Sequence, residues 1–264
     1  MEKASLPGIE LVKISIITVC YNSEVTIENT LRSVATQTYP YIEHIIIDAQ
    51  SSDGTMDIVN HYRARLTHVV SEPDRGMYDA MNKGLNLATG DVIGFLNSDD
   101  VFADNTVLEQ VAEAFSNQGV DACYADLVYV DKGNMTKVTR YWKSRPYEDG
   151  LFEKGWMPAH PTFYARRWVY EKYGKYDLAY RRQSDFELTL RFLAVHKINT
   201  IYIPKVLVRM RSGGASRGVW HILEGNIEAY RACRKHSLNV TPLFIAKKII
   251  SRVPQFFRRQ HSEA

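Results

Sequence analysis

The chain has 264 residues and a formal net charge of +3, and 45% of its residues are hydrophobic and 24% charged. This balance predicts a globular protein with a sizeable core. Its three cysteines, Cys20, Cys123 and Cys233, lie far apart without CxxC spacing, which argues against a disulfide framework or a zinc site. No run approaches the roughly 18 apolar residues of a bilayer span and the first residues do not form a secretory signal, so we expect a cytoplasmic protein.

Strands and helices alternate in the first half of the sequence. We predict strands at residues 14–20, 42–48, 67–71 and 92–96 because they are short and apolar. Helices are predicted at 24–36 with Ser23 as N-cap, at 55–66, at 77–88 with Gly90 as the stop signal, and at 104–116. This order predicts an α/β fold with a Rossmann-like, mostly parallel sheet flanked by helices.

The second half is less regular and rich in aromatic residues. It contains short strand-like pieces at residues 162–164 and 200–203 and a helix at 184–196. Residues 209–216 have two arginines and two glycines, which predicts a mobile loop whose Arg211 could close over a diphosphate. No linker, repeat or low-complexity stretch interrupts the sequence, so we expect one continuous domain followed by a tail.

Polar residues follow the predicted parallel strands, where such sheets bind their ligands. They are Tyr21-Asn22, Asp48, Glu72 to Asp74 and Asp99-Asp100. Two adjacent carboxylates at the end of a buried strand need a positive partner, and Mg²⁺ or Mn²⁺ would supply it. The alternative is that Asp99-Asp100 is an exposed cap before the helix at 104.

These segments carry a resemblance to a known family. ISIITVCYN, IIIDAQSSDGT, Asn82-Lys83-Gly84 and GDVIGFLNSDD occur in this order, and over residues 13–216 the sequence resembles the family 2 inverting glycosyltransferases of the GT-A fold. The resemblance implies a nucleotide-diphosphate sugar as donor, a contact of Asp48 with the base, and a contact of Asp99 with the ribose or the metal. It implies Asp100 as the direct ligand of Mg²⁺ or Mn²⁺. The further nucleotide-sugar contacts are expected at Tyr21, Asn22, Asp53, Arg75 and Lys83. Ala49-Gln50 departs from the family's more common Asp-Gly, which leaves the identity of the base open.

An inverting transfer needs a general base, and the resemblance points to Asp185, with Glu187 as the alternative. The Gln-x-x-Arg-Trp motif of processive members does not follow Asp185, so we expect transfer of a single sugar. His160 and Trp156 are candidate contacts of the acceptor or the diphosphate, and His160 is also a candidate for completing the metal site.

The sequence divides into an N-terminal extension (1–12), a glycosyltransferase domain (13–216, with halves 13–116 and 117–216) and a basic tail (217–264). The tail has no acid between residues 229 and 260 but eight Lys or Arg residues. An amphipathic helix there would either bind an anionic inner membrane surface or pack on the body.

We expect a glycan or lipid-linked oligosaccharide acceptor in surface polysaccharide or lipopolysaccharide synthesis, and no nucleic acid, because the strand-end acids would repel phosphate. The alternatives are a sugar-phosphate nucleotidyltransferase, which the lack of a glycine-rich loop after the first strand disfavours, and a non-catalytic nucleotide- or sugar-binding module.

Overall fold

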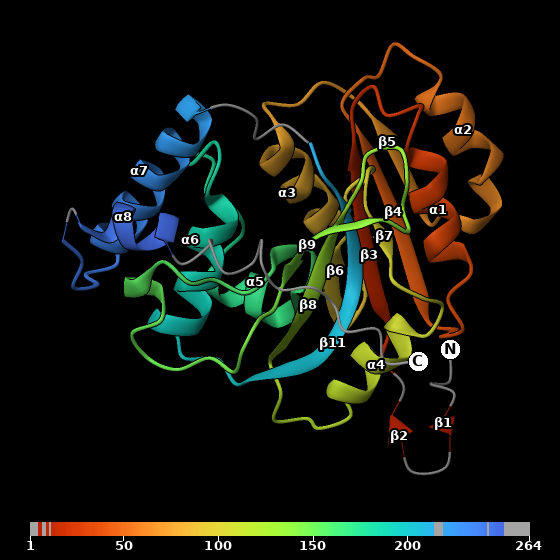
Figure 1. Cartoon of the computed structure of the whole chain (residues 1–264). Helices are drawn as coiled ribbons and strands as arrows, with labels where there is room; N and C mark the ends of the chain where they lie inside the picture. Colours follow the sequence, from red (N-terminus) through yellow and green to blue (C-terminus); the bar gives the residue numbers. More distant parts are fainter. Residues whose placement is uncertain (1–4, 7–8, 11, 214–218, 242, 251–264) are drawn as a thin grey trace.

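The computed structural model of the chain describes residues 5–6, 9–10, 12–213, 219–241 and 243–250. Its centre is a nine-stranded sheet with helices on both faces (Figure 1). The strand order is β5-β4-β3-β6-β10-β8-β11-β7, and β9 pairs with β8. The predicted class, an α/β fold with a mostly parallel sheet, is confirmed for the half that carries the strand-end acids.

The predicted parallel strands are confirmed. They are β3 (Ile14–Cys20), β4 (Ile42–Asp48), β5 (His68–Ser71) and β6 (Val92–Phe95). Cys20 pairs with Asp48 and Asp48 pairs with Ser71, so the carboxyl ends of β3, β4 and β5 are level. The side chains that follow these strands therefore meet at one edge of the sheet.

The helices of the first half are shorter than predicted. They are α1 (Ile27–Ala35), α2 (Thr55–His61) with the 3₁₀ turn η1 (Arg63–Arg65), α3 (Met77–Leu87) and α4 (Val107–Ala114). The prediction of Ser23 as N-cap was wrong, because α1 begins one turn later with Thr26 as N-cap, and the Ser23 hydroxyl contacts the Tyr21 carbonyl and the Ser98 hydroxyl instead. Gly90 does not end α3 directly; a Cβ atom there would lie 2.5 Å from Ser15 Oγ, so this glycine allows a close approach to β3.

Five further strands complete the sheet, in both parallel and antiparallel pairings. They are β7 (Val101–Phe102), β8 (Ala122–Val130), β9 (Val138–Trp142), β10 (Tyr164–Arg166) and β11 (Thr200–Arg211). The strand predicted at 162–164 begins later, because residues His160–Thr162 form the 3₁₀ turn η3. The predicted loop at 209–216 was wrong as far as Arg211, because β11 stays paired with β8 up to the pair Arg211–Val130. Residues 214–216 of that prediction lie outside the described residues.

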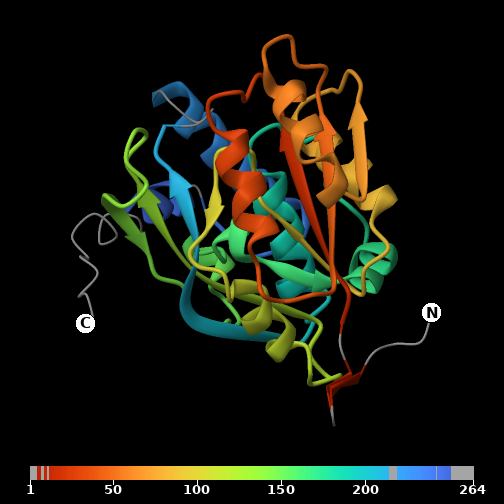
Figure 2. The ribbon, with the colours of Figure 1, turned by 90° about the vertical axis from the view of Figure 1, so that its right-hand side faces the viewer.

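Four helices and a short turn complete the body. They are η2 (Phe152–Lys154), α5 (Arg167–Tyr173), α6 (Ser184–Leu190), which continues as a π-helical turn (Arg191–Val195), α7 (Val219–Lys235) and α8 (Leu243–Ile250). Helices α1 and α2 lie on one face of the sheet, and α3, α5 and α6 on the other, with α7 and α8 beyond α6 (Figure 1). Figure 2, seen from the side of α1 and α2, places the green β8–β9 hairpin at the left margin of the sheet. A separate pair, β1 (Ser5–Leu6) and β2 (Ile9–Glu10), precedes the body.

The described part of the tail packs on the body. Phe244 of α8 is buried in the same core cluster as Phe152 and Phe186, and Lys248 is buried one turn later. Lys248, one of the eight basic residues of the tail, is thus not on a solvated face of the helix, because its stem packs closely against Gly155. Residues Arg252 to Arg259 of the predicted tail lie outside the described residues. Among the residues that the structure describes, no helix has the length and apolar character to span a bilayer.

Candidate active site

The turn after β3 is tied to the turn after β4. Asn22 has a left-handed backbone (φ 47°), which asparagine tolerates better than most residues. Its N–H donates to Ser51 Oγ at 2.8 Å, and its Oδ1 accepts the N–H of Ser52 at 2.9 Å. Tyr21 beside it is exposed. The structure therefore brings Tyr21 and Asn22 to the end of β4, as the motif order predicts.

Asp48 lies beneath this turn and is fully buried. Its carboxylate accepts Ser51 N–H at 3.0 Å, Ser51 Oγ–H at 2.5 Å and Ser71 Oγ–H at 2.6 Å. Together with a bond from the Cys20 thiol to Oδ1 at 3.6 Å, these bonds fix the turn and occupy the four lone-pair directions of the carboxylate. Asp53 closes the turn before α2, since its Oδ1 accepts Thr55 N–H at 3.0 Å. The contacts of both acids with a nucleotide stay predictions.

Arg75 and Lys83 both stabilise the segment before and within α3. Arg75 is exposed and pairs with Asp79 at 3.1 Å. Lys83 pairs with Glu72 at 2.8 Å and donates to the carbonyl of Pro73 at 2.6 Å. The structure thus gives these two cations structural partners in their own segment, and their contacts with a diphosphate stay predictions.

Asp99 and Asp100 follow β6 and are joined to β11 by Arg211. Asp100 is fully buried, and its Oδ1 accepts the backbone N–H of Arg211 at 3.3 Å. The guanidinium of Arg211 donates to the carbonyls of Asp99 at 3.1 Å and of Lys132 at 2.9 Å. The hydroxyl of Thr30 in α1 donates to the Asp100 carbonyl at 2.7 Å. Arg211, predicted in a mobile loop that could close over a diphosphate, therefore lies beside the acidic pair as a strand residue that holds the turn.

The acidic pair has the character of a cation site. Burial raises the pKa of Asp99, and burial together with the Asp99 charge raises the pKa of Asp100 well above its ordinary value. Asn97 Oδ1, on the same turn, is buried with no hydrogen-bond partner in the structure. No group of three or more His, Cys, Asp or Glu side chains among the described residues could enclose a metal ion. Two carboxylates and an unpaired amide oxygen nevertheless fit Mg²⁺ or Mn²⁺, which takes oxygen ligands and completes its shell with substrate phosphates and water.

Asp185 lies in the first turn of α6 and is held by two side chains from other elements. Its Oδ2 lies 3.2 Å from His160 Nδ1, and its Oδ1 accepts the hydroxyl of Tyr78 at 3.1 Å and the N–H of Phe186 at 2.8 Å. Burial lowers the pKa of His160, and the charge of Asp185 opposes this shift. His160 is therefore a partner of Asp185, and the expectation that it completes the metal site has no support in the structure. Sequence reasoning missed Tyr78, because nothing in its helical pattern distinguishes it from a core residue.

Glu187, the alternative base, is committed elsewhere. It is buried, and its carboxylate pairs with Arg191 at 3.0 Å and with His236 at 2.7 Å. Burial raises its pKa, but the hydrogen bonds from His236 and Arg191 outweigh burial and the pKa lies below its ordinary value. This ion cluster joins α6 to the end of α7, which is a structural role.

Aromatic rings connect the strand-end acids to Asp185. Phe95, at the end of β6, makes an edge contact with Tyr176 (centroids 5.4 Å apart), and Tyr176 stacks on Tyr78 at 5.3 Å. Trp156 packs edge-on against Phe152 at 5.7 Å, and Phe152 packs against Phe186. Trp156 is half-buried, and its Nε1–H is buried with no hydrogen-bond partner in the structure.

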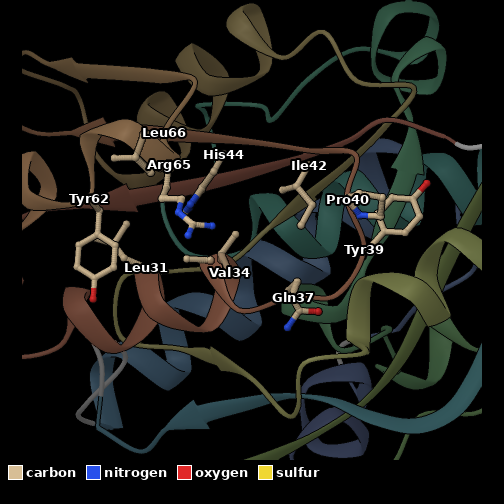
Figure 3. A pocket seen from close by; sticks show the side chains of 11 residues that line it. Leu31, Val34, Gln37, Tyr39, Pro40, Ile42, His44, Tyr62, Arg65 and Leu66 are labelled. Atoms are coloured by element: carbon tan, nitrogen blue, oxygen red, sulfur yellow. The ribbon is translucent and has the colours of Figure 1, made fainter. Parts of the chain in front are cut away.

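A cavity of about 230 Å³ lies elsewhere, between α1 and β4 (Figure 3). It is lined by Ile42, the first residue of β4, and by Leu66, which precedes β5. It therefore opens near the amino ends of these strands, away from the predicted site. His44 in its wall is buried, which lowers its pKa to about 3, and its Nε2 lies 3.0 Å from the hydroxyl of Thr18. None of the predicted site residues lines this cavity.

Comparison with known proteins identifies the family. The glycosyl transferase family 2 profile matches residues 15–174. A PGL/p-HBAD biosynthesis glycosyltransferase of Mycobacterium tuberculosis is 30% identical over 209 residues, which cover 78% of this chain and 79% of the relative. The chain therefore belongs to glycosyl transferase family 2 and is a glycosyltransferase.

Solved structures show the same fold at low identity. TarS 1–349 of S. aureus in complex with UDP-GlcNAc has a TM-score of 0.67 and 20% identity, covering 93% of this chain and 72% of that chain. Against a longer TarS chain the coverage is 44% of that chain. The mannosyltransferase PcManGT of Pyrobaculum calidifontis, in complex with GDP-Man and Mn²⁺, has a TM-score of 0.63 and 19% identity, covering 92% of this chain and 69% of that chain. The fold is thus GT-A.

Proposed function

We propose that this chain is a non-processive inverting glycosyltransferase that moves one sugar from a nucleotide-diphosphate sugar to an acceptor hydroxyl. The observation that supports this most is the pair of acidic centres built from separate elements. Asp99 and Asp100 lie in the turn between β6 and β7, while Asp185 of α6 is held by His160 and Tyr78. Single-sugar transfer is supported by the sequence after Asp185, where the motif of processive members is missing.

In this proposal the acidic pair binds the donor diphosphate through a divalent cation. Asp100 and Asp99 would hold Mg²⁺ or Mn²⁺, which neutralises charge on the departing diphosphate when bound. The Mn²⁺ complex of the Pyrobaculum mannosyltransferase supports this choice. The exposed Tyr21 ring, Asn22, Asp48 and Asp53 would surround the nucleoside, and Arg75 and Lys83 would lie near the diphosphate. UDP-GlcNAc and GDP-Man in related structures leave the nucleotide open.

Asp185 would act as the general base. Its carboxylate takes the proton of the acceptor hydroxyl while the acceptor oxygen bonds to the anomeric carbon and the bond from that carbon to the diphosphate breaks. A neutral His160 donates from Nδ1 to Oδ2 and orients the carboxylate for this transfer. Trp156, with its unpaired indole N–H, would contact the acceptor.

The acceptor would be a glycan or a lipid-linked oligosaccharide, as in polysaccharide or lipopolysaccharide synthesis. The biosynthetic name of the mycobacterial relative supports a cell-envelope acceptor.

Arg231 and Arg234 of α7 are exposed, and they would attract the enzyme to an anionic inner membrane surface. Sedimentation with anionic and neutral vesicles tests this; equal binding to both would contradict it.

The test of the main proposal is a donor screen. UDP-, GDP- and dTDP-sugars are incubated without acceptor, with Mn²⁺, Mg²⁺ or EDTA, and slow hydrolysis is measured for the wild type and for Asp100→Asn. Asp104→Asn is the matched control, because Asp104 is an exposed acid that only caps the turn before α4 through Thr106. Hydrolysis of one donor that is lost with EDTA and in Asp100→Asn, but kept in Asp104→Asn, would support the proposal. Hydrolysis unaffected by EDTA and by Asp100→Asn would refute the metal site, and nucleotide binding without turnover on any acceptor would favour a binding module.

A further inference from the structure

Glu228 of α7 binds the loop that leads into α6. Its Oε1 accepts the backbone N–H of Arg181 at 3.1 Å, and its Oε2 accepts those of Arg182 at 2.8 Å and Gln183 at 3.0 Å. One carboxylate thus collects three successive N–H groups at the start of α6. Hydrogen bonds to an ionised acceptor are about twice as strong as neutral ones, so this loop is held firmly from α7.

The loop that Glu228 holds is also the support of Asp185. Asp185 follows Gln183 by two residues, and the carbonyl of Arg182 lies 3.1 Å from the Tyr78 hydroxyl that also contacts Asp185 Oδ1. A shift of the loop would therefore move the carboxylate and its hydroxyl partner together.

A second helix of the C-terminal region reaches the same loop. Lys248 of α8 is buried, and its Nζ donates to Gln183 Oε1 at 2.7 Å while lying 4.1 Å from the centre of the Phe186 ring. Gly225 of α7 also lies against Gln183, because a Cβ atom there would be 3.4 Å from Gln183 Nε2. Helices α7 and α8 thus converge on the residue before the first turn of α6.

We infer that Glu228 is a positioning residue for Asp185, and that α7 belongs to the catalytic body. The inference rests on the proposed role of Asp185 as general base. The carboxylate of Glu228 fixes the backbone of residues 181–183, and this backbone sets where the Asp185 carboxylate meets the acceptor hydroxyl. A displacement of the order of 1 Å in such a group lowers a rate by up to about 100-fold.

Glu228→Ala, Glu228→Gln and the control Glu224→Gln test the inference. Glu224 lies one turn earlier on α7 and pairs with the Arg182 side chain at 2.9 Å, so it is an acid of the same helix that contacts a side chain of this loop. The measurements are the hydrolysis rate of the donor identified by the screen, the nucleotide dissociation constant by calorimetry, and hydrogen exchange of amides 181–183. Glu228→Ala is expected to lower the rate about 10- to 100-fold, with faster amide exchange and a dissociation constant changed by less than about 2-fold. The rate of Glu228→Gln should fall between those of Glu228→Ala and the wild type, because the one amide oxygen of glutamine still accepts some of the three N–H groups of residues 181–183. This variant serves as the test if the alanine variant does not fold.

The decisive readout is the same substitution in an Asp185→Asn background. If Glu228 acts through Asp185, adding Glu228→Ala there changes the residual rate by less than about 2-fold. An equal loss in both backgrounds, or an unchanged rate with accelerated exchange, would overturn the inference and leave the proposed function standing. A wild type that hydrolyses no donor and binds no nucleotide would overturn the proposed function and this inference with it.

Discussion

His160 Nδ1 lies 3.2 Å from Oδ2 of Asp185, on the side of the carboxylate opposite the Tyr78 hydroxyl and the Phe186 N–H, which both lie on Oδ1. Because burial lowers the pKa of His160, the ring is neutral at neutral pH. A neutral ring that donates from Nδ1 leaves Nε2 as an acceptor. The two oxygens of Asp185 are thus differently engaged, and Oδ2 keeps lone pairs for an acceptor proton.

Asp185→Asn removes the base while keeping the shape of the side chain and an oxygen for its N–H and hydroxyl donors. We expect the rate of sugar transfer, or of donor hydrolysis, to fall by about 10²- to 10⁴-fold. The nucleotide dissociation constant should stay within about 3-fold, since the proposed base touches the acceptor side only. Steady-state kinetics and calorimetry check both. The matched control is Asp177→Asn, an acid of the preceding loop that pairs with Lys235 at 2.7 Å; a similar rate loss there would argue that any carboxylate near α6 matters.

His160→Ala separates two roles of this histidine. If His160 acts by orienting Asp185, its removal should lower the rate about 10-fold in the wild type and less than about 2-fold in the Asp185→Asn background. If His160 contacts the acceptor or the diphosphate directly, the loss should be equal in both backgrounds. The rates of the wild type, the two single variants and the double variant, measured at one pH, complete this double-mutant cycle. Tyr78→Phe, which removes the other side-chain donor to Asp185, should behave like His160→Ala.

The parallel half of the fold was predictable because its signals are local. The strands Ile14–Cys20 and Ile42–Asp48 are continuous β-branched apolar runs, and the structure gives them the predicted bounds. The strands of the second half could not be predicted with the same accuracy. Whether Arg209 to Arg211 form a loop or a strand depends on pairing with β8, which lies about 80 residues earlier in the chain, and glycines that follow a strand give the same local pattern as a mobile loop.

The candidate site divides in the same way. Asp48, Asp99, Asp100 and Asp185 could be located from motif order and strand ends. Tyr78 and Glu228 could not, because their roles come from hydrogen bonds to residues 107 and 45 to 47 positions away in sequence. A tyrosine and a glutamate on amphipathic helices carry no local signal of such partners.

Phe244→Ala measures how the C-terminal region is attached. Phe244 is 1% exposed and packs against Phe186, whereas the neighbouring Leu243 is 66% exposed. Phe244→Ala should lower the free energy of unfolding by about 3 kcal/mol, and Leu243→Ala by less than about 0.5 kcal/mol. Urea unfolding at pH 7 measures the free energy of unfolding of both variants. Loss of vesicle binding in Phe244→Ala with unchanged stability would instead mean that this face of α8 binds membrane.

Glu43 offers a test of how stability depends on pH. It is 1% exposed on β4 and accepts bonds from Ser15 Oγ, Thr89 N and Lys13 Nζ at 2.5, 2.8 and 3.0 Å. Burial raises its pKa, but these hydrogen bonds outweigh burial and lower the pKa to about 2. Because the folded-state pKa lies below the unfolded value of about 4.3, the ionised group stabilises the fold above that pH, and this contribution is lost progressively as the pH falls towards 2.

Glu43→Gln should therefore be less stable than the wild type by about 3 kcal/mol at pH 7, the free energy that corresponds to lowering the pKa from about 4.3 to about 2. The difference should be the same at pH 6 and should shrink as the pH falls from 4 to 3. Urea unfolding of both chains at these pH values measures it. Glu171→Gln is the control, because Glu171 is an exposed acid that pairs with Arg167 of the same helix at 2.7 Å, so its substitution should change stability by less than about 0.5 kcal/mol. A stability difference for Glu43→Gln that grows as the pH falls would contradict the assignment, because it would mean that folding favours the protonated form of this carboxyl group.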